Sequence, residues 1–208
     1  MEKTINQILK LLDNQYGKEA ICYLDYTKDY ELMVATILAA QCTDDRVNKV
    51  TQKLFVKYNK IEDFADCNLA ELEQDVFQTG FYRNKAQNIK KSCGQLIKDY
   101  SKIMPTDIET LTKLAGVGRK TANVILTHIF KQPSIVVDTH VKRVSYRLGL
   151  TKEKDPTKIE FELMRVLPKE NWARYNSQIM AVGRTSCKGP KPKCEECFLK
   201  HHCKKVLV

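Results

Sequence analysis

Four cysteines near the end of this 208-residue chain constrain its fold more than any other feature of the sequence. They lie within 17 residues in the spacing C-x6-C-x2-C-x5-C, at Cys187, Cys194, Cys197 and Cys203. Thiolates so close in sequence can converge on one metal centre, which can order a segment that has little apolar content of its own. Sulfur ligation suits zinc and iron–sulfur centres alike, although zinc sites generally contain two separated C-x-x-C pairs and this chain has one.

The rest of the chain is predicted to be helical. Apolar residues recur every three or four positions in ten segments, whereas the best strand candidate, residues 134–137, is too short to found a sheet. Asp107, Asp155 before Pro156, and Asn171 suit the first positions of helices. We therefore expect an all-α fold, with helices over residues 4–15, 30–41, 45–58, 69–76, 84–99, 107–113, 119–130, 138–148, 156–167 and 171–182.

The positive charge is concentrated in two segments. The net charge is +10; residues 111–150 carry seven basic and one acidic side chain, and residues 184–208 carry seven and two. This distribution suits a polyanionic partner, with nucleic acid as the leading candidate, because neutralising phosphates releases counterions. A solvated basic face that serves only solubility is the alternative.

Neither a membrane span nor a secretory signal is expected. The longest apolar stretch, Leu32 to Ala40, is far shorter than the roughly 20 residues that a span requires. The N-terminus lacks the basic region, apolar core and small-residue cleavage site of a signal peptide. We therefore expect a cytosolic protein.

Two glycines separate two helical patterns between residues 111 and 126. Gly116 and Gly118 permit the positive φ of a tight hairpin, which Leu114 and Val117 can anchor. The second helix would begin near Arg119 with exposed backbone N–H groups, which favour a phosphate.

Taken by themselves, two further residues near this region have ordinary structural interpretations. Lys120 suits a phosphate-binding lysine at a helix start, and Asp138 suits a helix N-cap. His140 is better suited to lining a site or contacting a phosphate than to acting as a base.

The motifs taken together resemble a known family. Leu114-Ala-Gly-Val-Gly-Arg-Lys-Thr-Ala122, then Val137-Asp-Thr-His-Val141, then the four-cysteine spacing occur in this order, and Ala40-Gln-Cys-Thr-Asp44 and Gly80-Phe-Tyr-Arg-Asn-Lys-Ala86 also match. The chain is similar to the endonuclease III family, bifunctional DNA glycosylases and abasic-site lyases of the helix-hairpin-helix superfamily.

The resemblance implies an architecture and a cofactor. It implies two helical lobes around a DNA-binding cleft: a six-helix lobe over residues 22–132 that carries the hairpin, and a second lobe of residues 1–21 and 133–208. The four cysteines, within residues 187–203, would hold a [4Fe-4S] cluster as structural support, with zinc as the alternative. The expected protein is a monomer, located with the bacterial or archaeal nucleoid, and its partner is duplex DNA containing a damaged pyrimidine or an abasic site.

The resemblance also assigns the chemistry. Lys120 would attack the sugar carbon C1′ and form a Schiff base that permits β-elimination at the abasic site, while Asp138 would stabilise the cationic sugar. The substrates implied are oxidised pyrimidines.

The implied DNA contacts involve several further residues. Gln41 and Phe81 would fill the space left by an extruded nucleotide, although Gln41 could instead end a buried helix and Phe81 could belong to the core. Asp44 would line the lesion pocket. The expected backbone contacts are Gly116, Gly118, Arg119, Thr121, His140, Lys188, Lys191 and Lys193.

Three positions depart from the family pattern. Ala115 stands where proline often occurs, Thr79 where an apolar insertion residue is expected, and Val182 where histidine is expected. A related adenine-mismatch glycosylase lacks the lysine at position 120. The competing interpretation from a different class is a non-catalytic DNA-binding module that contains zinc.

Overall fold

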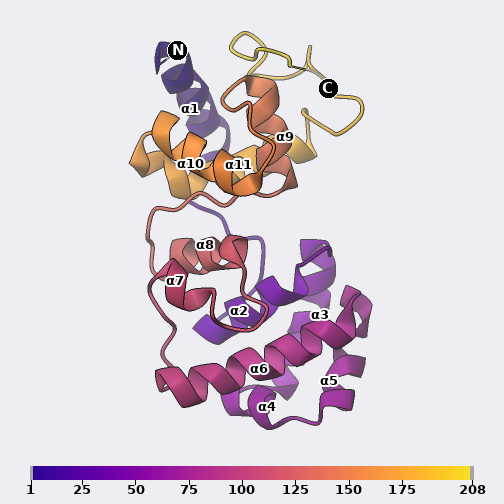
Figure 1. Cartoon of the computed structure of the whole chain (residues 1–208). Helices are drawn as coiled ribbons and strands as arrows, with labels where there is room; N and C mark the ends of the chain where they lie inside the picture. Colours follow the sequence, from indigo (N-terminus) through magenta and orange to yellow (C-terminus); the bar gives the residue numbers. More distant parts are fainter. Residues whose placement is uncertain (1, 207–208) are drawn as a thin grey trace. The chain divides into compact units, whose positions relative to one another are not determined.

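The computed structural model describes residues 2–206, so the ends of the predicted lobes at residue 1 and residues 207–208 lie outside the described residues. The described residues form eleven α-helices and two short 3-10 helices, and they contain no strand, which confirms the all-α prediction. They divide into two compact units (Figure 1). The hairpin unit is Cys22–Phe130, and the cysteine unit comprises residues up to Ile21 together with residues from Lys131 onward.

None of the helices in the described part of the chain combines the length and the hydropathy that crossing a membrane requires.

The hairpin unit is built around one long helix, α6. Figure 1 shows α6 lying along α4 and α5, and α6 also contacts α2. The helices of this unit are α2 (Asp29–Leu38), α3 (Asp44–Lys57), α4 (Ile61–Asp66), α5 (Leu69–Asp75), the 3-10 helix η1 (Phe77–Thr79), α6 (Tyr82–Tyr100), α7 (Ile108–Leu111) and α8 (Arg119–His128).

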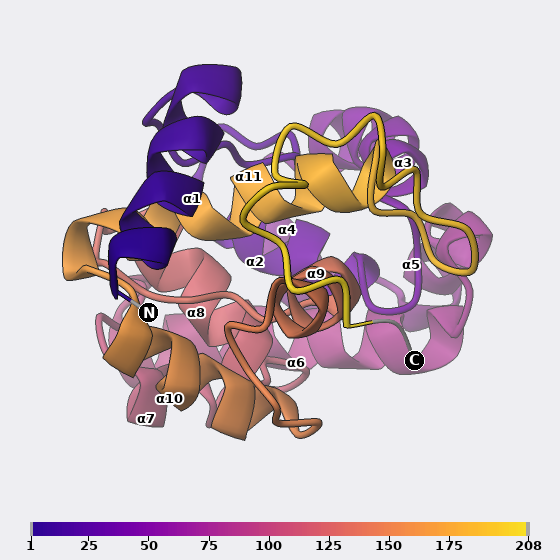
Figure 2. The ribbon, with the colours of Figure 1, turned by 90° about the horizontal axis from the view of Figure 1, so that it is seen from above.

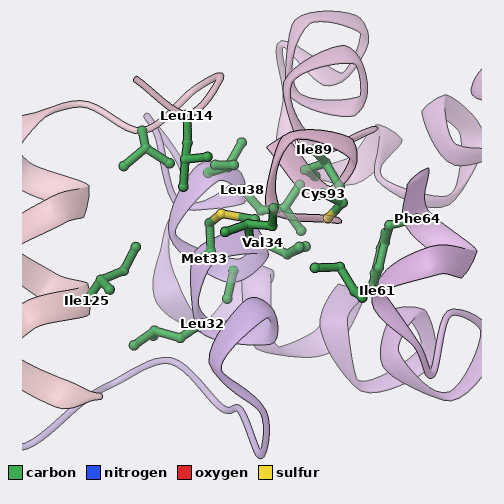
Figure 3. Packing of buried hydrophobic residues seen from close by; sticks show 14 of the residues in the cluster. Leu32, Met33, Val34, Leu38, Ile61, Phe64, Ile89, Cys93, Leu114 and Ile125 are labelled. Carbon is green, nitrogen blue, oxygen red and sulfur yellow. The ribbon is translucent and has the colours of Figure 1, made fainter. Parts of the chain in front are cut away.

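The core of the hairpin unit surrounds α2, whose residues 31–38 are all buried. Figure 3 shows side chains from several helices meeting those of α2: Ile61 and Phe64 from α4, Ile89 and Cys93 from α6, and Ile125 from α8. A helix with apolar side chains on every face is stable only inside a core, because side chains left in water do not gain the free energy of burial. This burial explains why the apolar stretch that begins at Leu32 is a core helix.

The sequence pattern missed α4. Its six residues are too few to show helical periodicity, and it forms because Ile61 and Phe64 are buried and because the Asp63 carboxylate accepts a hydrogen bond from the Lys60 backbone N–H at 2.9 Å. The helix predicted over residues 30–41 ends at Leu38, because residues 39–42 form a turn in which Gln41 has a φ of +53°.

The cysteine unit contains α1 (Glu2–Tyr16), α9 (Thr139–Leu148), α10 (Pro156–Val166), η2 (Lys169–Asn171) and α11 (Trp172–Arg184). Helices α9 and α11 pack together. The coil of residues 185–206 contacts both of these helices (Figure 2). The Asp13 carboxylate on α1 pairs with Arg174 on α11 at 2.7 Å, and it also accepts a hydrogen bond from Gln178. This ion pair, whose two side chains are each 13% exposed, attaches α1 to the unit.

Three of the expected helix starts have aspartate caps with side-chain hydrogen bonds. Asp107, Asp138 and Asp155 each accept a hydrogen bond from the backbone N–H three residues later. Asn171 precedes α11 without a side-chain cap, because the chain already turns there in η2. The predicted caps at Asp107 and Asp155 are therefore confirmed, with Pro156 in the first turn of α10.

The predicted hairpin lies between α7 and α8, and its anchors are buried as expected. Leu114 is 2% exposed and Val117 is 3% exposed, and burying each contributes about 1.5–3 kcal/mol. Gly116 has a φ of +74°, and a Cβ atom on it would lie 2.8 Å from the Cβ of Asn88 on α6. The hairpin therefore needs glycine at position 116 for both its conformation and its packing.

Of the two glycines that permit a positive φ in this hairpin, only Gly116 adopts one. Gly118 has a φ of −87° and a ψ of 176°, which is ordinary extended backbone at the N-cap of α8, and a Cβ atom there would meet nothing within 4 Å. One left-handed residue is enough to reverse the chain, because Gly116 turns it and Val117 then anchors it.

Replacing Gly116 is expected to destabilise the hairpin unit more than replacing its neighbour. Gly116→Ala should lower the free energy of unfolding by about 1–3 kcal/mol, because alanine must adopt a left-handed conformation and displace Asn88. Gly118→Ala should cost less than about 1 kcal/mol, as expected for a change at an N-cap. Urea denaturation followed by circular dichroism measures both values. Equal losses in the two variants would contradict this account of the hairpin.

Candidate functional site

Lys120 is an exposed side chain at the second residue of α8. The helix begins after Gly118, which has no side chain to cap it, and its first turn contains Arg119 and Lys120 and no acidic residue. The positive end of the helix dipole and two cations therefore act together at this point. Thr121, the next residue, is half-buried. The arrangement attracts phosphate and also presents a primary amine to solvent.

The hairpin is attached to α6 by one glutamine side chain. Gln95 accepts a hydrogen bond from the Ala115 N–H at 2.8 Å and donates one from its Nε2 to the Lys113 carbonyl oxygen at 3.1 Å. Ala115 stands where the family often has proline, and a proline could not donate this hydrogen bond. The departure from the family pattern is therefore matched by a specific contact.

Asp138 is the N-cap of α9 in the cysteine unit. Its Oδ1 accepts a hydrogen bond from the Val141 N–H at 2.7 Å, so the N-cap interpretation of this residue is confirmed. The side chain remains half-buried. The preceding segment is held in place by Asn176, whose Nδ2 donates to the Val136 carbonyl oxygen at 3.0 Å. Capping uses one carboxylate oxygen, so a second role for Asp138 is compatible with it.

His140 is half-buried and packed against α11. Its Nδ1 lies 3.2 Å from the Arg143 Nη2, and this nitrogen must accept because a guanidinium can only donate. Burial lowers the pKa of His140, and the charges of Arg143 and Arg184 lower it further, while Asp138 acts in the opposite direction. A Cβ atom on Gly183 would approach this Nδ1 to 2.5 Å, so Gly183 allows the imidazole to lie against the helix.

The four clustered cysteines line a single cavity of about 30 Å³ in the cysteine unit. Its remaining walls include apolar side chains such as those of Val144, Leu148 and Leu199. Burial raises the pKa of the Cys197 and Cys203 thiols, and the neighbouring cysteines raise it further. Within residues 2–206, no three His, Cys, Asp or Glu side chains are grouped closely enough to hold a metal ion as they stand.

Arg147 on α9 holds the start of the loop that carries the four cysteines, residues 187–203. It donates hydrogen bonds at 2.6 Å to the carbonyl oxygens of Lys188 and Gly189, and its Nη1 lies 3.5 Å from the Sγ of Cys187. Arg143, one turn earlier, donates to the carbonyl oxygens of Gly183 and Cys187. Two arginines therefore fix the backbone that carries the first cysteine.

The loop between the first two of these cysteines carries three exposed lysines, Lys188, Lys191 and Lys193. The Lys193 N–H donates to the Ser186 carbonyl oxygen at 2.8 Å, and the Lys193 ammonium pairs with Glu196 at 3.2 Å. The loop therefore presents Lys188 and Lys191 to solvent from a backbone that is hydrogen-bonded on both sides.

Gln41 and Phe81 are both exposed, and both have left-handed backbones. Phe81, with a φ of +48°, is 68% exposed, so the alternative that it belongs to the core is wrong. Thr79, by contrast, is 2% exposed, and its hydroxyl donates to the Val76 carbonyl oxygen. Asp44 is the first residue of α3 and is half-buried.

The candidate residues belong to both units. The hairpin unit contains Gln41, Asp44, Phe81 and residues 116–121, whereas the cysteine unit contains Asp138, His140, the three lysines and the four cysteines. Sequence reasoning missed the residues that hold these groups in place: Lys85, Asn88, Gln95, Arg143 and Arg147. Nothing in the local pattern identifies them, because each has a partner that lies at least 20 positions away along the chain.

Comparison with known proteins relates nearly the whole chain to one family. Residues 34–169 match the model of the HhH-GPD superfamily base excision DNA repair protein. The endonuclease III of Bacillus subtilis is 47% identical over 186 residues, which is 89% of this chain and 85% of the relative. The endonuclease III of Synechocystis sp. is 46% identical over 198 residues, which is 95% of this chain and 90% of the relative.

A solved structure agrees with these matches. It is a trapped endonuclease III–DNA covalent intermediate, described as an estranged-adenine complex, which is 43% identical and covers 99% of this chain and 96% of its own, with a TM-score of 0.92. The family resemblance noted in the sequence is thereby confirmed. The chain belongs to the endonuclease III family of the HhH-GPD superfamily, and it is a base excision repair DNA glycosylase with abasic-site lyase activity.

Proposed function

We propose that this enzyme removes oxidised pyrimidines from duplex DNA and that Lys120 is the nucleophile for both base removal and strand cleavage. The observation that carries the proposal is the exposed amine of Lys120 on the first turn of the helix that follows the hairpin. A relative that is 43% identical has been trapped as a covalent intermediate with DNA, which supports a covalent mechanism here.

The reaction begins with attack of the neutral Lys120 amine on C1′. The N-glycosidic bond breaks, its electron pair leaves with the base, and the base is protonated. The sugar ring then opens, so that C1′ and the lysine nitrogen form a Schiff base and the ring oxygen becomes a hydroxyl. The iminium withdraws electrons from C2′, a base removes a C2′ proton, and the C3′–O bond breaks with loss of the 3′ phosphate. Lysine serves both activities because the same covalent adduct leads to both.

We propose that Asp138 stabilises the positive charge that develops on the sugar and assists proton transfer as the base departs. This role requires Asp138 and Lys120 to act on the same nucleotide. The cap at the start of α9 favours the role, because it holds the carboxylate in one orientation.

Phosphate contacts and nucleotide extrusion complete the proposal. Gly116, Gly118, Arg119, Thr121 and His140 would contact the DNA backbone, as would Lys188, Lys191 and Lys193. Gln41 and Phe81 would fill the space of the extruded nucleotide, and Asp44 would line the lesion pocket. The exposure of Phe81 supports an insertion role, because an aromatic ring that does not pack in the protein core is available to stack on a base. We expect the enzyme to act as a monomer on the bacterial nucleoid.

We propose that Cys187, Cys194, Cys197 and Cys203 hold a [4Fe-4S] cluster. Four thiols are the donor set of such a cluster, all four line one cavity, and the Arg147 guanidinium faces the Cys187 sulfur. The four thiols would have to draw closer together than they stand here to bind the iron atoms. With four protein thiolates the cluster serves as structural support, ordering the loop that carries the three lysines. Zinc held by the same thiolates is the alternative.

Replacing the proposed nucleophile should separate binding from chemistry. Lys120→Ala is expected to abolish borohydride trapping on duplexes that contain thymine glycol or an abasic site, because no Schiff base can form. Its affinity for the same duplexes should fall by less than about tenfold, because one phosphate contact is a small part of the electrostatic binding. Gel analysis of trapped complexes and fluorescence anisotropy measure the two properties.

Lys113→Ala provides the matched control, since Lys113 is an exposed lysine on the same hairpin. This variant should be trapped at the wild-type rate. Normal trapping by Lys120→Ala would show that another residue is the nucleophile. Loss of trapping in wild-type protein with an intact metal centre would remove the lyase mechanism proposed here.

Substitutions at Asp138 should separate its capping role from its charge. Asp138→Asn keeps an N-cap acceptor, so the free energy of unfolding should change by less than about 0.5 kcal/mol, whereas Asp138→Ala should lose about 1 kcal/mol. Both variants should release the damaged base at least about 100-fold more slowly, because both lack the carboxylate. Single-turnover base release and urea denaturation provide the measurements. Wild-type base release by Asp138→Asn would leave Asp138 with a capping role only.

Metal analysis should identify the group held by the cysteines. The purified protein should be yellow-brown and contain about four irons and four acid-labile sulfides per chain. Cys197→Ser should lose the colour and should expose the 188–193 loop to protease. Cys93→Ser, a change at a buried cysteine outside the set, should keep the colour. A colourless protein with one zinc per chain would favour the DNA-binding module.

A further inference from the structure

Lys85 is a buried lysine whose ammonium has two carbonyl oxygens as hydrogen-bond partners. The side chain is 4% exposed, and its Nζ donates to the Leu38 carbonyl oxygen at 2.9 Å and to the Thr79 carbonyl oxygen at 2.6 Å. Burial lowers its pKa, because the charged form is less stable in a poorly solvated site. Burying a lysine is costly, so this position requires a reason beyond filling space.

The two carbonyl groups belong to the two segments that carry the proposed insertion residues. Leu38 is the last residue of α2 and lies three positions before Gln41. Thr79 ends η1 and lies two positions before Phe81. The ammonium therefore links the ends of two segments that are separated by about 40 residues of chain, and it provides a partner for a carbonyl at the C-terminal end of α2.

Lys85 also fixes the second segment through its backbone. Its N–H donates to the Phe81 carbonyl oxygen at 3.1 Å in the first turn of α6, so residues 79–81 are held by the backbone and the side chain of one residue. Both Gln41 and Phe81 have a positive φ, which is strained for side chains of their types and persists only where the surroundings enforce it. The bonds to Leu38 and Thr79 are such an enforcement, because they fix the backbone just before each strained residue.

We infer that Lys85 is a positioning residue for nucleotide extrusion, which holds the Gln41 and Phe81 segments at a fixed separation so that both side chains enter the duplex together. The inference rests on the insertion role proposed above for Gln41 and Phe81. Without the ammonium, the two segments lose their common partner, and the strained backbones relax independently. Binding DNA would then have to order both segments, and this cost would reduce the net free energy that Gln41 and Phe81 contribute to binding.

The test uses the full-length enzyme and two substrates that differ in their need for extrusion. Lys85→Met removes the donors while it keeps the length of the side chain. It should release thymine glycol from a duplex about tenfold more slowly, whereas borohydride trapping on a single-stranded abasic oligonucleotide should change less than about twofold, because no stacked partner must be displaced there.

Two further variants complete the comparison. Lys90→Met is the matched control, because Lys90 lies on the same helix and also donates to a carbonyl oxygen, that of Cys67, which is in neither segment. It should match wild type on both substrates. Lys85→Gln, which keeps two N–H donors on a neutral side chain, should recover part of the duplex rate, and it replaces Lys85→Met if the methionine variant does not fold.

A double-mutant cycle separates this inference from the function on which it rests. In a Gln41→Ala/Phe81→Ala background, adding Lys85→Met should change the duplex rate less than about twofold, because the residues through which Lys85 acts are gone. A further tenfold loss in that background, or equal losses on duplex and single strand, would overturn the positioning role. A Gln41→Ala/Phe81→Ala enzyme as fast as wild type on the duplex would instead remove the insertion role itself.

Discussion

The packing of the Gly116 backbone against Asn88 of α6 determines where α8 begins. A side chain at position 116 would overlap Asn88, so the hairpin can lie this close to α6 only with glycine at its turn. Leu114 and Val117 then bury their side chains beneath it, and Gln95 holds the intervening backbone from the same helix. Lys120 follows within one turn of this arrangement, so the position of its amine depends on how the hairpin packs.

Helix α6 supports more than the hairpin. Near its start, Lys85 binds the segments that lead to Gln41 and Phe81, while Asn88 and Gln95 contact the hairpin further along. The proposed nucleophile and the proposed insertion residues are therefore positioned by one rigid element. Extrusion of a nucleotide and attack on its sugar require groups at fixed distances from one another, and a single helix of 19 residues provides this more reliably than separate loops do.

Helix α9 has a corresponding role in the cysteine unit. It begins at the carboxylate of Asp138, and its next two turns carry Arg143 and Arg147, which bind the backbone around Cys187 and the two residues after it. Both arginines donate to carbonyl oxygens, so hydrogen bonds within the protein already hold the backbone of residues 187–189 in place. A cluster bound by the four thiols would then stabilise a loop whose first part is already held in place.

The sequence by itself determined the features that depend on neighbours along the chain. Helical periodicity, the aspartate caps at Asp107 and Asp155, the glycine turn and the cysteine spacing all involve residues a few positions apart, and the family motifs are made of the same short patterns. The tertiary structure alone decided which groups hold them. Lys85 meets a carbonyl 47 positions away and Arg147 meets one 41 positions away, and α4 forms because Ile61 and Phe64 are buried in the core. Such contacts leave no local pattern, because the atoms become neighbours only when distant helices pack together.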